Sequence, residues 1–315
     1  RFNYAEVSLP GGCAWGPRPV NYHLQAIEAL GAEVDLSDGM IIAKGELKGG
    51  LINFQQSSVG ATGNALMAAV NANGTTTIKN AAKEPEIEAL CHFLLKMGAD
   101  IKGIGTDEII IVGQKTLNAD IEYSVIPDRI EAGTFLIAGA CTYGDISVTN
   151  VNPNHLDIVL NYLAEAGFNL DVQNDSIRIY PSQNYINPVD MITGIYPGFP
   201  TDLQAQWMAL MTLANGNSKI TEEIYTDRFT HIAELTRFGA QVTLLGNIAK
   251  ILGTNKLTGA PVMSTDIRAS ASLIIAALSA EGKSSISRIY HIDRGYENIE
   301  DKFNILGAQI KRIKE

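Results

Sequence analysis

One pattern occurs five times along the chain, and this repeat limits the possible folds more than any other feature of the sequence. Each occurrence has an apolar stretch with helical spacing, a glycine followed by Ala or Phe, and a short stretch with the alternation of a strand. Glycine suits the position after a helix, where a left-handed residue ends it. The segments are Leu24 to Val34, Ile87 to Ile101, Leu156 to Leu170, Ile232 to Val242 and Ile299 to Ile310, with Gly31, Gly98, Gly167, Gly239 and Gly307 as their glycines. An interval of about 70 residues leaves room for one small α/β unit in each repeat.

A second recurring element lies between these segments. It consists of a helix rich in small apolar residues, a stop that contains glycine, and a strand of β-branched residues. It spans Gly60 to Ile78, Ala132 to Val148, Asp202 to Ile220 and Asp266 to Ile286, with further strands expected at Ile109 to Val112 and Ser176 to Tyr180. Because the helices are apolar on nearly every side, the predicted fold class is α/β with helices inside and sheets outside. An ordinary α/β protein with similar helix ends is the alternative, and the matching order of the five segments disfavours it.

The composition indicates the number of domains and excludes some partners. The chain has 315 residues, of which 46% are hydrophobic, so we expect two domains rather than one very large core. The net charge of -10 and the pI near 5.0 argue against nucleic acid or an anionic membrane surface as a partner. An anionic ligand must therefore meet a local group of cationic side chains.

The cysteines and the hydropathy indicate where the protein works. The chain has three cysteines, whose spacing resembles neither a disulfide framework nor a zinc site, and this fits a reducing cytoplasm. No apolar run approaches the roughly 20 residues that a membrane helix needs. The first residue is Arg1, and the residues after it form neither a signal peptide nor a transit peptide. We therefore expect a cytoplasmic protein, and a sequence that starts within a domain.

A glycine-rich loop carries the first candidate for chemistry. In the stretch Gly11 to Pro19, two glycines precede Cys13, and Arg18 would favour its thiolate if the two side chains approach each other. Cys91 and Cys141 lie in apolar helical runs, so we interpret them as inert core residues. Cys13 is the candidate reactive thiol.

Two further stretches precede predicted helices, whose first turns favour anions. In Gln55 to Thr62, hydroxyl groups and unhindered amides could hold a diphosphate, or the serines could simply cap the helix. In Phe199 to Asp202, the aspartate could accept a proton from a substrate hydroxyl, or it could cap the following helix. From the residues alone, capping is the stronger interpretation at both places.

Arginines recur in equivalent loops of the repeats. Arg228, Arg268 and Arg294, together with Arg18, would supply planar, bidentate donors for a carboxylate and a phosphate. The alternative is that each arginine of the three loops pairs with the aspartate beside it. Such a cluster would also explain how an acidic protein binds an anion.

Other common chemistries have no support in the sequence. His155, His231 and His291 recur where helices start, and their spacing is not that of a metal site. No phosphate-binding loop, dinucleotide fingerprint or serine nucleophile elbow is present. ATP hydrolysis, nicotinamide chemistry and α/β-hydrolase chemistry therefore have no support in the sequence.

Seven ordered blocks resemble one family over nearly the whole chain. They are Leu9 to Cys13 with Arg18 to Val20, Ser58 to Thr62, Ala81 to Ile87, Pro127 to Glu131, Phe199 to Gln206, Thr265 to Ser272 and Arg288 to Tyr296. With these blocks the chain resembles the UDP-N-acetylglucosamine 1-carboxyvinyltransferases. The resemblance implies two domains, each an inside-out α/β barrel of three repeats. We expect a catalytic-loop domain at residues 1–126, incomplete at its start because the family's opening repeat is absent, and a second barrel at residues 127–315.

The resemblance also implies a reaction, the first committed step of peptidoglycan synthesis. Enolpyruvate passes from phosphoenolpyruvate to the 3′-hydroxyl of UDP-N-acetylglucosamine, and phosphate leaves. The implied reaction needs no metal and no organic cofactor. The implied catalytic residues are Cys13, Asp202 and Arg294. Cys13 protonates the enolpyruvyl methylene and is the expected site of alkylation by fosfomycin. Asp202 takes the proton of the sugar hydroxyl. The implied phosphoenolpyruvate ligands are Arg18, Arg228, Arg268 and Arg294. The implied sugar-nucleotide contacts are Arg18, Pro19, Val20, Asn21, Tyr22, Gln56, Ser57, Ser58, Val59, Asp202 and Ile224.

Two departures from the family pattern bear on nucleotide binding. Gln56 stands where the family commonly has lysine, and Asn21 where it has aspartate. We expect weaker or altered nucleotide binding from these changes. A shikimate 3-phosphate enolpyruvyl transferase and a non-catalytic paralogue that binds the sugar nucleotide are the alternative functions, and the sequence does not indicate an oligomeric state.

Overall fold

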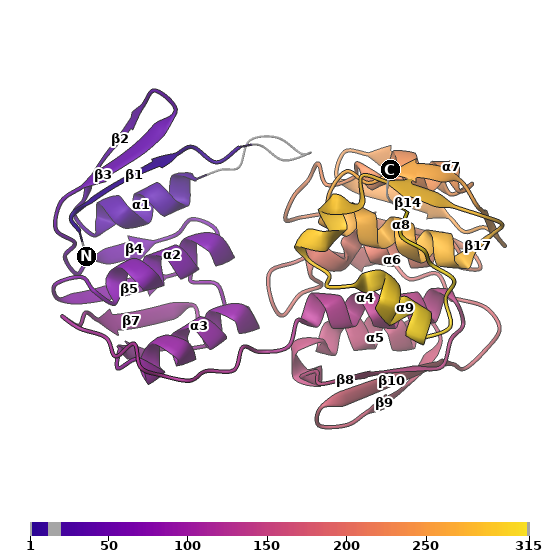
Figure 1. Cartoon of the computed structure of the whole chain (residues 1–315), viewed down its shortest axis with the longest axis horizontal. Coiled ribbons are helices and arrows are strands. Elements are labelled where there is room, and N and C mark those ends of the chain that lie inside the picture. Colours follow the sequence, from indigo (N-terminus) through magenta and orange to yellow (C-terminus); the bar gives the residue numbers. More distant parts are fainter. Residues whose placement is uncertain (1, 12–19, 314–315) are drawn as a thin grey trace. The chain divides into compact units, whose positions relative to one another are not determined.

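The computed structural model describes residues 2–11 and 20–313, and it divides into two compact units (Figure 1). Unit 1 comprises Arg1–Ile126 with Ile195–Pro197, and unit 2 comprises Pro127–Gly194 with Gly198–Glu315. Each unit contains its own cluster of buried apolar side chains. In the described part of the chain, no helix is both long and apolar enough to cross a membrane.

The described part of unit 1 combines helices with two small sheets. Its helices are α1 (Asn21–Ala29), α2 (Val59–Ala69) and α3 (Pro85–Lys96). An antiparallel sheet of order β1-β3-β2 contains β1 (Tyr4–Ser8), β2 (Glu33–Ser37) and β3 (Met40–Lys44). A sheet of order β4-β5-β7-β6 contains β4 (Leu51–Asn53), β5 (Thr75–Lys79), β6 (Asp100–Lys102) and β7 (Glu108–Val112). In the second sheet β4 and β5 are parallel, and the other neighbours are antiparallel.

Three helices pack against one another within unit 2, and each has most of its residues buried: α4 (Arg129–Cys141), α6 (Gln204–Met211) and α8 (Ile267–Ser279). Two glycines of α4 also permit close contact with the turn before α6 and with the strand after α4. A Cβ atom added at Gly133 would lie 2.5 Å from the side chain of Leu203, and one at Gly139 would lie 2.8 Å from Ile146. The shorter helices are α5 (Asp157–Glu165), α7 (His231–Arg237) and α9 (Ile299–Ile305), with 3-10 turns η1 (Pro153–His155), η2 (Thr201–Leu203) and η3 (Ile289–Arg294).

The sheets of unit 2 repeat the topology of unit 1. The sheet of order β11-β12-β14-β13 has the pattern of β4-β5-β7-β6, with one parallel and two antiparallel pairings. Its strands are β11 (Met191–Ile192), β12 (Asn217–Thr221), β13 (Gln241–Leu245) and β14 (Ile248–Leu252). A second sheet, β8-β10-β9, contains β8 (Ile146–Thr149), β9 (Phe168–Val172) and β10 (Ser176–Pro181). Two parallel pairs complete the unit: β15 (Leu257–Thr258) with β17 (Ala280–Glu281), and β16 (Pro261–Met263) with β18 (Ser285–Ser287).

The repeat predicted from the sequence is present in both units. Each of the five predicted helices ends two residues before its predicted glycine. All five glycines have φ between +93° and +100°, which confirms their role as helix C′ residues. They are Gly31, Gly98, Gly167, Gly239 and Gly307. Strands follow the first four glycines. The strand expected after Gly307 is wrong for the described residues, since 308–313 form no strand. There Asn304 bonds both backbone groups of Ile310, so the chain folds back on α9.

Candidate functional site

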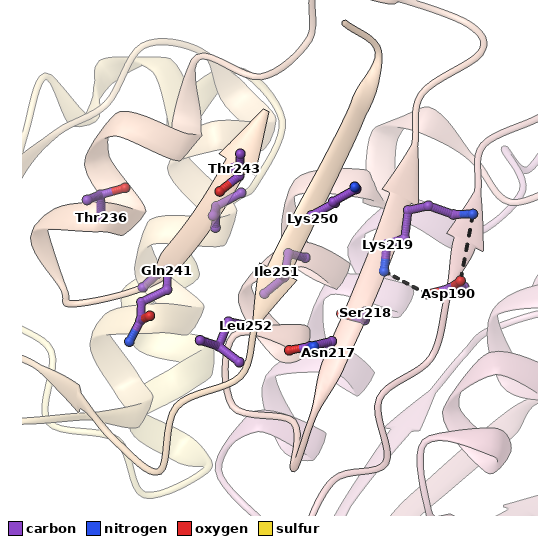
Figure 2. A pocket seen from close by; sticks show the side chains of 12 residues that line it. Asp190, Asn217, Ser218, Lys219, Thr236, Gln241, Thr243, Lys250, Ile251 and Leu252 are labelled. Carbon is purple, nitrogen blue, oxygen red and sulfur yellow. Dashed lines mark hydrogen bonds and ion pairs between the residues drawn. The ribbon is translucent and has the colours of Figure 1, made fainter. Parts of the chain in front are cut away.

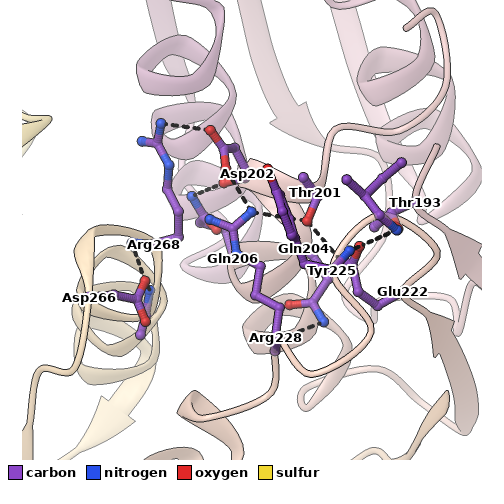
Figure 3. A network of polar contacts seen from close by, with 12 residues as sticks. Thr193, Thr201, Asp202, Gln204, Gln206, Glu222, Tyr225, Arg228, Asp266 and Arg268 are labelled. Atoms are coloured by element: carbon purple, nitrogen blue, oxygen red, sulfur yellow. Dashed lines mark hydrogen bonds and ion pairs between the residues drawn. The ribbon is translucent and has the colours of Figure 1, made fainter. Parts of the chain in front are cut away.

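In unit 2, two arginines converge on one carboxylate (Figure 3). Asp202 lies in η2, directly before α6, while Arg228 precedes α7 and Arg268 lies in the first turn of α8. Arg228 Nη1 is 2.7 Å from Oδ1 of Asp202, and Arg268 Nη2 is 3.0 Å from its Oδ2. The two arginine side chains are only 8% and 16% exposed, whereas that of Asp202 is 37% exposed. The carboxylate therefore faces outward over two nearly buried cations.

Opposing effects act on the charge of Asp202. Burial raises the pKa of this carboxyl, and the positive charges of Arg268 and Arg228 more than offset this, so that its pKa lies below the ordinary value. The pKa of Arg268 is raised: burial acts to lower it, and the pairing with Asp202 outweighs burial. Asp202 is thus a charged carboxylate and, while it is paired in this way, a weak base.

A buried polar layer supports Arg268. The hydroxyl of Tyr296 accepts a hydrogen bond of 3.4 Å from Arg268 Nη1 and lies 2.8 Å from Thr134 Oγ1. Gln206 Nε2 donates to Thr134 Oγ1 at 3.1 Å and to the backbone oxygen of Asp202 at 2.9 Å. These contacts join α4, α6 and the segment after η3, and they hold the guanidinium of Arg268 beside the aspartate.

A second buried layer supports Arg228. Its Nη1 donates to Thr201 Oγ1 at 3.0 Å, and Thr201 Oγ1 in turn donates to Glu222 Oε2 at 2.9 Å. The guanidinium of Arg228 also lies over the ring of Tyr225, 5.6 Å from its centroid. Glu222 is fully buried, so this layer places a second carboxylate beneath the partly exposed Asp202.

Arg294 lies apart from these contacts. It is exposed at the end of η3 and forms no hydrogen bond or ion pair with another described residue. It lines an open pocket with Asp128, Glu131 and Arg312 among others. The neighbouring Asp293 is held by Arg312, whose Nη1 and Nη2 donate to its carboxylate at 2.9 and 2.8 Å. Arg294 is therefore a cation available to a ligand on the segment that also carries Tyr296.

In unit 1, the first turns of α1 and α2 lie side by side. His23 of α1 is within hydrogen-bond distance of Asn64 of α2, 3.2 Å from Nδ1 to Nδ2, and its ring occupies the space beside Gly60. Ser58 caps α2, since its hydroxyl accepts from the N–H of Ala61 at 3.3 Å. Tyr22 packs edge-on against Phe54, with 5.9 Å between ring centroids. Two helix starts thus present backbone N–H groups next to each other, an arrangement that suits an anionic ligand.

Other surfaces of the described chain offer fewer side chains that could bind a ligand. An open pocket lies on the sheet of β11, β12, β14 and β13. Lys219 and Lys250, which are paired across the neighbouring strands β12 and β14, line it (Figure 2). Lys219 is within 3.9 Å of Asp190 there, and both side chains are exposed. Within residues 2–11 and 20–313, no group of three or more His, Cys, Asp or Glu side chains is placed to hold a metal ion.

The chain is similar over its whole length to known enzymes. The model of the EPSP synthase (3-phosphoshikimate 1-carboxyvinyltransferase) family matches residues 1–303. A UDP-N-acetylglucosamine 1-carboxyvinyltransferase of Chlorobium chlorochromatii is 54% identical over 100% of this chain and 74% of that protein. One from Campylobacter hominis is 52% identical over 100% of this chain and 75% of that protein. The chain belongs to the UDP-N-acetylglucosamine 1-carboxyvinyltransferase family.

Solved structures agree with this family at the level of the fold. The enolpyruvyl transferase NikO from Streptomyces tendae superposes with a TM-score of 0.85 at 23% identity, covering 98% of this chain and 74% of that one. An EPSP synthase from Acinetobacter baumannii gives a TM-score of 0.72 at 20% identity, covering 98% and 75%. The fold is therefore the mixed α/β fold of the enolpyruvyl transferases.

The structure brings together some of the residues that the family resemblance implied. In unit 2, Arg228 and Arg268 both pair with Asp202, and not with the aspartates beside them in sequence. The interpretation of Asp202 as a helix cap is wrong, because its carboxylate binds the arginines and η2 begins after Pro200. Ile224 lies between Glu222 and Arg228, and its N–H donates to Glu222 Oε1 at 2.9 Å.

The remaining predicted residues fall into two groups. Val20, Asn21, Tyr22, Gln56, Ser57, Ser58 and Val59 all lie at or just before the starts of α1 and α2. Cys13, Arg18 and Pro19 lie outside the described residues. Cys91 and Cys141 are buried free thiols, as predicted. Burial, helped by the charge of Glu88, raises the pKa of Cys91 to about 11, and burial also raises that of Cys141.

Two residues at these sites carried no signal in the sequence analysis. Glu222 stands in a Thr-Glu-Glu-Ile stretch, where a charged residue is normally expected at the surface. His23 lies in the first turn of an ordinary amphipathic helix. The strand before Glu222, Asn217–Thr221, has one aliphatic residue, Ile220, so the sequence there gives no sign of a buried carboxylate.

Proposed function

We propose that this protein transfers enolpyruvate from phosphoenolpyruvate to the 3′-hydroxyl of UDP-N-acetylglucosamine and releases phosphate, a step of peptidoglycan precursor synthesis. The observation that carries the proposal is the pairing of Asp202 with Arg228 and Arg268, which joins a partly exposed carboxylate to two nearly buried anion-binding groups. Relatives that are 54% and 52% identical and named for this activity support the choice of the sugar nucleotide as acceptor. Shikimate 3-phosphate is the less favoured acceptor, because the EPSP synthase structure is only 20% identical.

The proposed chemistry is an addition followed by an elimination. The sugar oxygen bonds to C2 of phosphoenolpyruvate while C3 receives a proton from Cys13, which gives a tetrahedral ketal. Loss of phosphate from C2 and of a proton from C3 then restores the double bond. Asp202 accepts the proton of the sugar hydroxyl, and Arg18, Arg228, Arg268 and Arg294 hold the phosphate and carboxylate while charge redistributes.

The geometry of Asp202 suggests the order of these events. The arginines that would hold phosphoenolpyruvate are the same groups that lower the pKa of Asp202. When an anionic substrate draws Arg228 and Arg268 away, the aspartate loses its countercharges and its pKa rises, because burial then dominates. Substrate binding thereby converts Asp202 from an ion-pair partner into a stronger base.

The sugar nucleotide is proposed to bind at the starts of α1 and α2. The first-turn N–H groups there favour its diphosphate, and Arg18, Pro19, Val20, Asn21, Tyr22, Gln56, Ser57, Ser58, Val59, Asp202 and Ile224 are the proposed contacts. We further propose that residues 1–126 and 127–315 form two domains with the inside-out barrel arrangement of the family, and that the protein acts in the cytoplasm. The packing of α4, α6 and α8 against one another supports this arrangement.

Phosphate release tests the proposed function directly. The complete gene product is incubated with phosphoenolpyruvate and either UDP-N-acetylglucosamine or shikimate 3-phosphate, with Cys13→Ala as the control variant. We expect release only with the sugar nucleotide, and its loss in the variant. Release with shikimate 3-phosphate would identify the sister activity instead. Binding of the nucleotide with no release would favour a non-catalytic paralogue.

The glutamine at position 56 permits a test of sugar-nucleotide binding alone, independent of the transfer reaction. Gln56 is exposed just before α2, where a cation would add attraction for a diphosphate to that of the helix start. We expect Gln56→Lys to tighten UDP-N-acetylglucosamine binding by about fivefold, a typical gain for one added charge. Calorimetric titration measures this, with Gln55→Lys, also exposed and one residue earlier, as the matched control. An unchanged dissociation constant would remove Gln56 from the proposed contacts.

A further inference from the structure

Glu222 is a carboxylate with no exposed surface, and it lies next to the group formed by Asp202, Arg228 and Arg268. A buried charge is costly unless every acceptor position is satisfied. Here Oε1 accepts from Thr193 Oγ1 at 2.8 Å and from the N–H groups of Ile224 and Tyr225 at 2.9 and 3.0 Å. Oε2 accepts from Thr201 Oγ1 at 2.9 Å. None of the roles proposed so far explains why so costly a group stands at this position.

The four donors belong to three different segments of unit 2. Figure 3 shows three of them, Thr193, Thr201 and Tyr225, near Glu222. Thr193 follows β11, Thr201 begins η2 and is the neighbour of Asp202, and Ile224 and Tyr225 lead to Arg228. The side chain of Glu222 therefore ties together the segments that carry the proposed base, an arginine and a proposed nucleotide contact. A neutral aliphatic residue of the same size could fill the space but could not join these segments.

The charge of Glu222 also sets the direction of one hydroxyl group. An ionised carboxylate can only accept hydrogen bonds, and a guanidinium can only donate them. Thr201 Oγ1 lies between the two, 2.9 Å from Glu222 Oε2 and 3.0 Å from Arg228 Nη1. Its proton must therefore point to Glu222, which leaves its lone pairs for Arg228. This hydrogen bond remains to hold Arg228 when the guanidinium exchanges Asp202 for an anionic substrate.

We propose that Glu222 is a positioning residue for the enolpyruvyl transfer. Through Thr201 it fixes the guanidinium of Arg228 in the orientation that binds phosphoenolpyruvate. Through Oε1 it fixes the backbone of Ile224 and Tyr225. The inference rests on the proposed function for its substrate, and the two can be tested separately because binding and turnover are separate measurements.

Glu222→Gln separates the effect of Glu222 on Arg228, through Thr201, from its effect on the backbone of Ile224 and Tyr225. The amide oxygen can still accept from the N–H groups of Ile224 and Tyr225, whereas the amide nitrogen faces Thr201 and competes with Arg228 for its lone pairs. We expect the KM for phosphoenolpyruvate to rise about tenfold, the loss of one charge-assisted hydrogen bond. The KM for the sugar nucleotide should change less than twofold.

The variants for this experiment are Glu222→Gln, Thr201→Val, the double variant and Thr201→Ser, all in the complete gene product. Because Glu222 acts through Thr201, the double variant should be no worse than either single one. Thr201→Ser keeps the hydroxyl and should retain nearly the original KM. Thr193→Val is the matched control: it removes another hydrogen bond to Glu222, on the side away from Arg228, and should lower the unfolding midpoint without raising the KM for phosphoenolpyruvate.

Direct binding of phosphoenolpyruvate, measured by calorimetry, completes the test. Weaker binding in Glu222→Gln and Thr201→Val, but not in Thr193→Val, supports the inference even if the unmodified protein releases no phosphate. Additive effects in the double variant, or equal losses in Thr193→Val, would overturn it and leave Glu222 a purely structural residue. Failure of the unmodified protein to bind phosphoenolpyruvate would overturn both the inference and the proposed function.

Discussion

Asp202 is the residue at which the electrostatics and the proposed chemistry meet. A general base works best when its pKa lies near the working pH, and the pKa of Asp202 is instead lowered by two arginines against the effect of burial. The same two arginines are the groups to which we assign the substrate's anionic ends. Asp202 and an anionic substrate therefore compete for Arg228 and Arg268.

This competition predicts an uncommon result for Asp202→Asn. The variant should lose about 100-fold in kcat, the usual effect of removing a general base. It should nevertheless bind phosphoenolpyruvate several-fold more tightly, because no internal anion holds the arginines. Calorimetry and single-turnover phosphate release measure the two effects, and Asp190→Asn, which removes an exposed partner of Lys219, serves as the control. Weaker binding of phosphoenolpyruvate by Asp202→Asn would contradict the competition.

His231 gives unit 2 a pH-dependent stability. Burial lowers the pKa of this imidazole to about 4, with Asp266 acting to raise it and Arg228 to lower it. The unfolded chain binds a proton near the ordinary value of 6.5, so it takes up that proton before the folded state does. Stability is therefore full above pH 6.5 and falls as the pH decreases toward 4.

The free energy of unfolding, measured by denaturant titration between pH 4 and 7, tests this. We expect a slope of at most about 1.4 kcal/mol per pH unit from His231, and a clear reduction of the slope in His231→Gln. His92→Gln, which replaces an exposed histidine of α3, is the control. An equal slope in the original protein and in His231→Gln would mean that His231 does not titrate as its burial implies.

The strands β7 and β14 are each followed by a glycine that lies in close contact with the backbone of another segment. Gly113 follows β7 and Gly253 follows β14, and the N–H of each donates at 2.9 Å to a glycine carbonyl, of Gly74 and Gly216 respectively. A Cβ atom at Gly253 would lie 1.8 Å from the carbonyl oxygen of Ala214, and one at Gly113 would lie 1.7 Å from that of Ala72. The glycines are required there because backbone occupies the space of a side chain.

Gly253→Ala should therefore destabilise unit 2 by about 3 kcal/mol, the size expected of a clash with fixed backbone. Gly63→Ala is the matched control. It lies within α2, its added Cβ would meet Leu90 at an ordinary 3.6 Å, and it should stabilise the protein by up to about 1 kcal/mol. Urea unfolding curves distinguish the two. A Gly253→Ala variant as stable as the original protein would show that the turn after β14 can shift without cost.

At the scale of helices and strands, much of the fold could be predicted from the sequence. Helix ends were predictable because a left-handed glycine is a local requirement, as the φ angles of Gly31 and Gly239 illustrate. The partners of Asp202 were not predictable from the residues, because Arg228 and Arg268 lie 26 and 66 positions away and only the packing of α6, α7 and α8 unites them. Glu222 was missed for the same reason: its burial depends on three distant segments.

For the whole molecule, the separation of the two apolar cores is the main physical feature. One cluster includes Leu66 of α2, and the other includes Leu273 of α8, and both side chains are fully buried. Each cluster lies within one compact unit. If the two units are folding domains, as we propose, each core should set the stability of its own unit.

Leucine truncation in either core tests this proposal. Leu66→Ala and Leu273→Ala each remove a buried side chain, which typically costs about 3 kcal/mol. In scanning calorimetry we expect two transitions, of which Leu66→Ala lowers one and Leu273→Ala the other. Since Trp207 is buried in unit 2, its fluorescence should follow the transition that Leu273→Ala lowers. A single transition that both variants shift equally would mean that the units unfold as one, and the two cores would then belong to one cooperative domain.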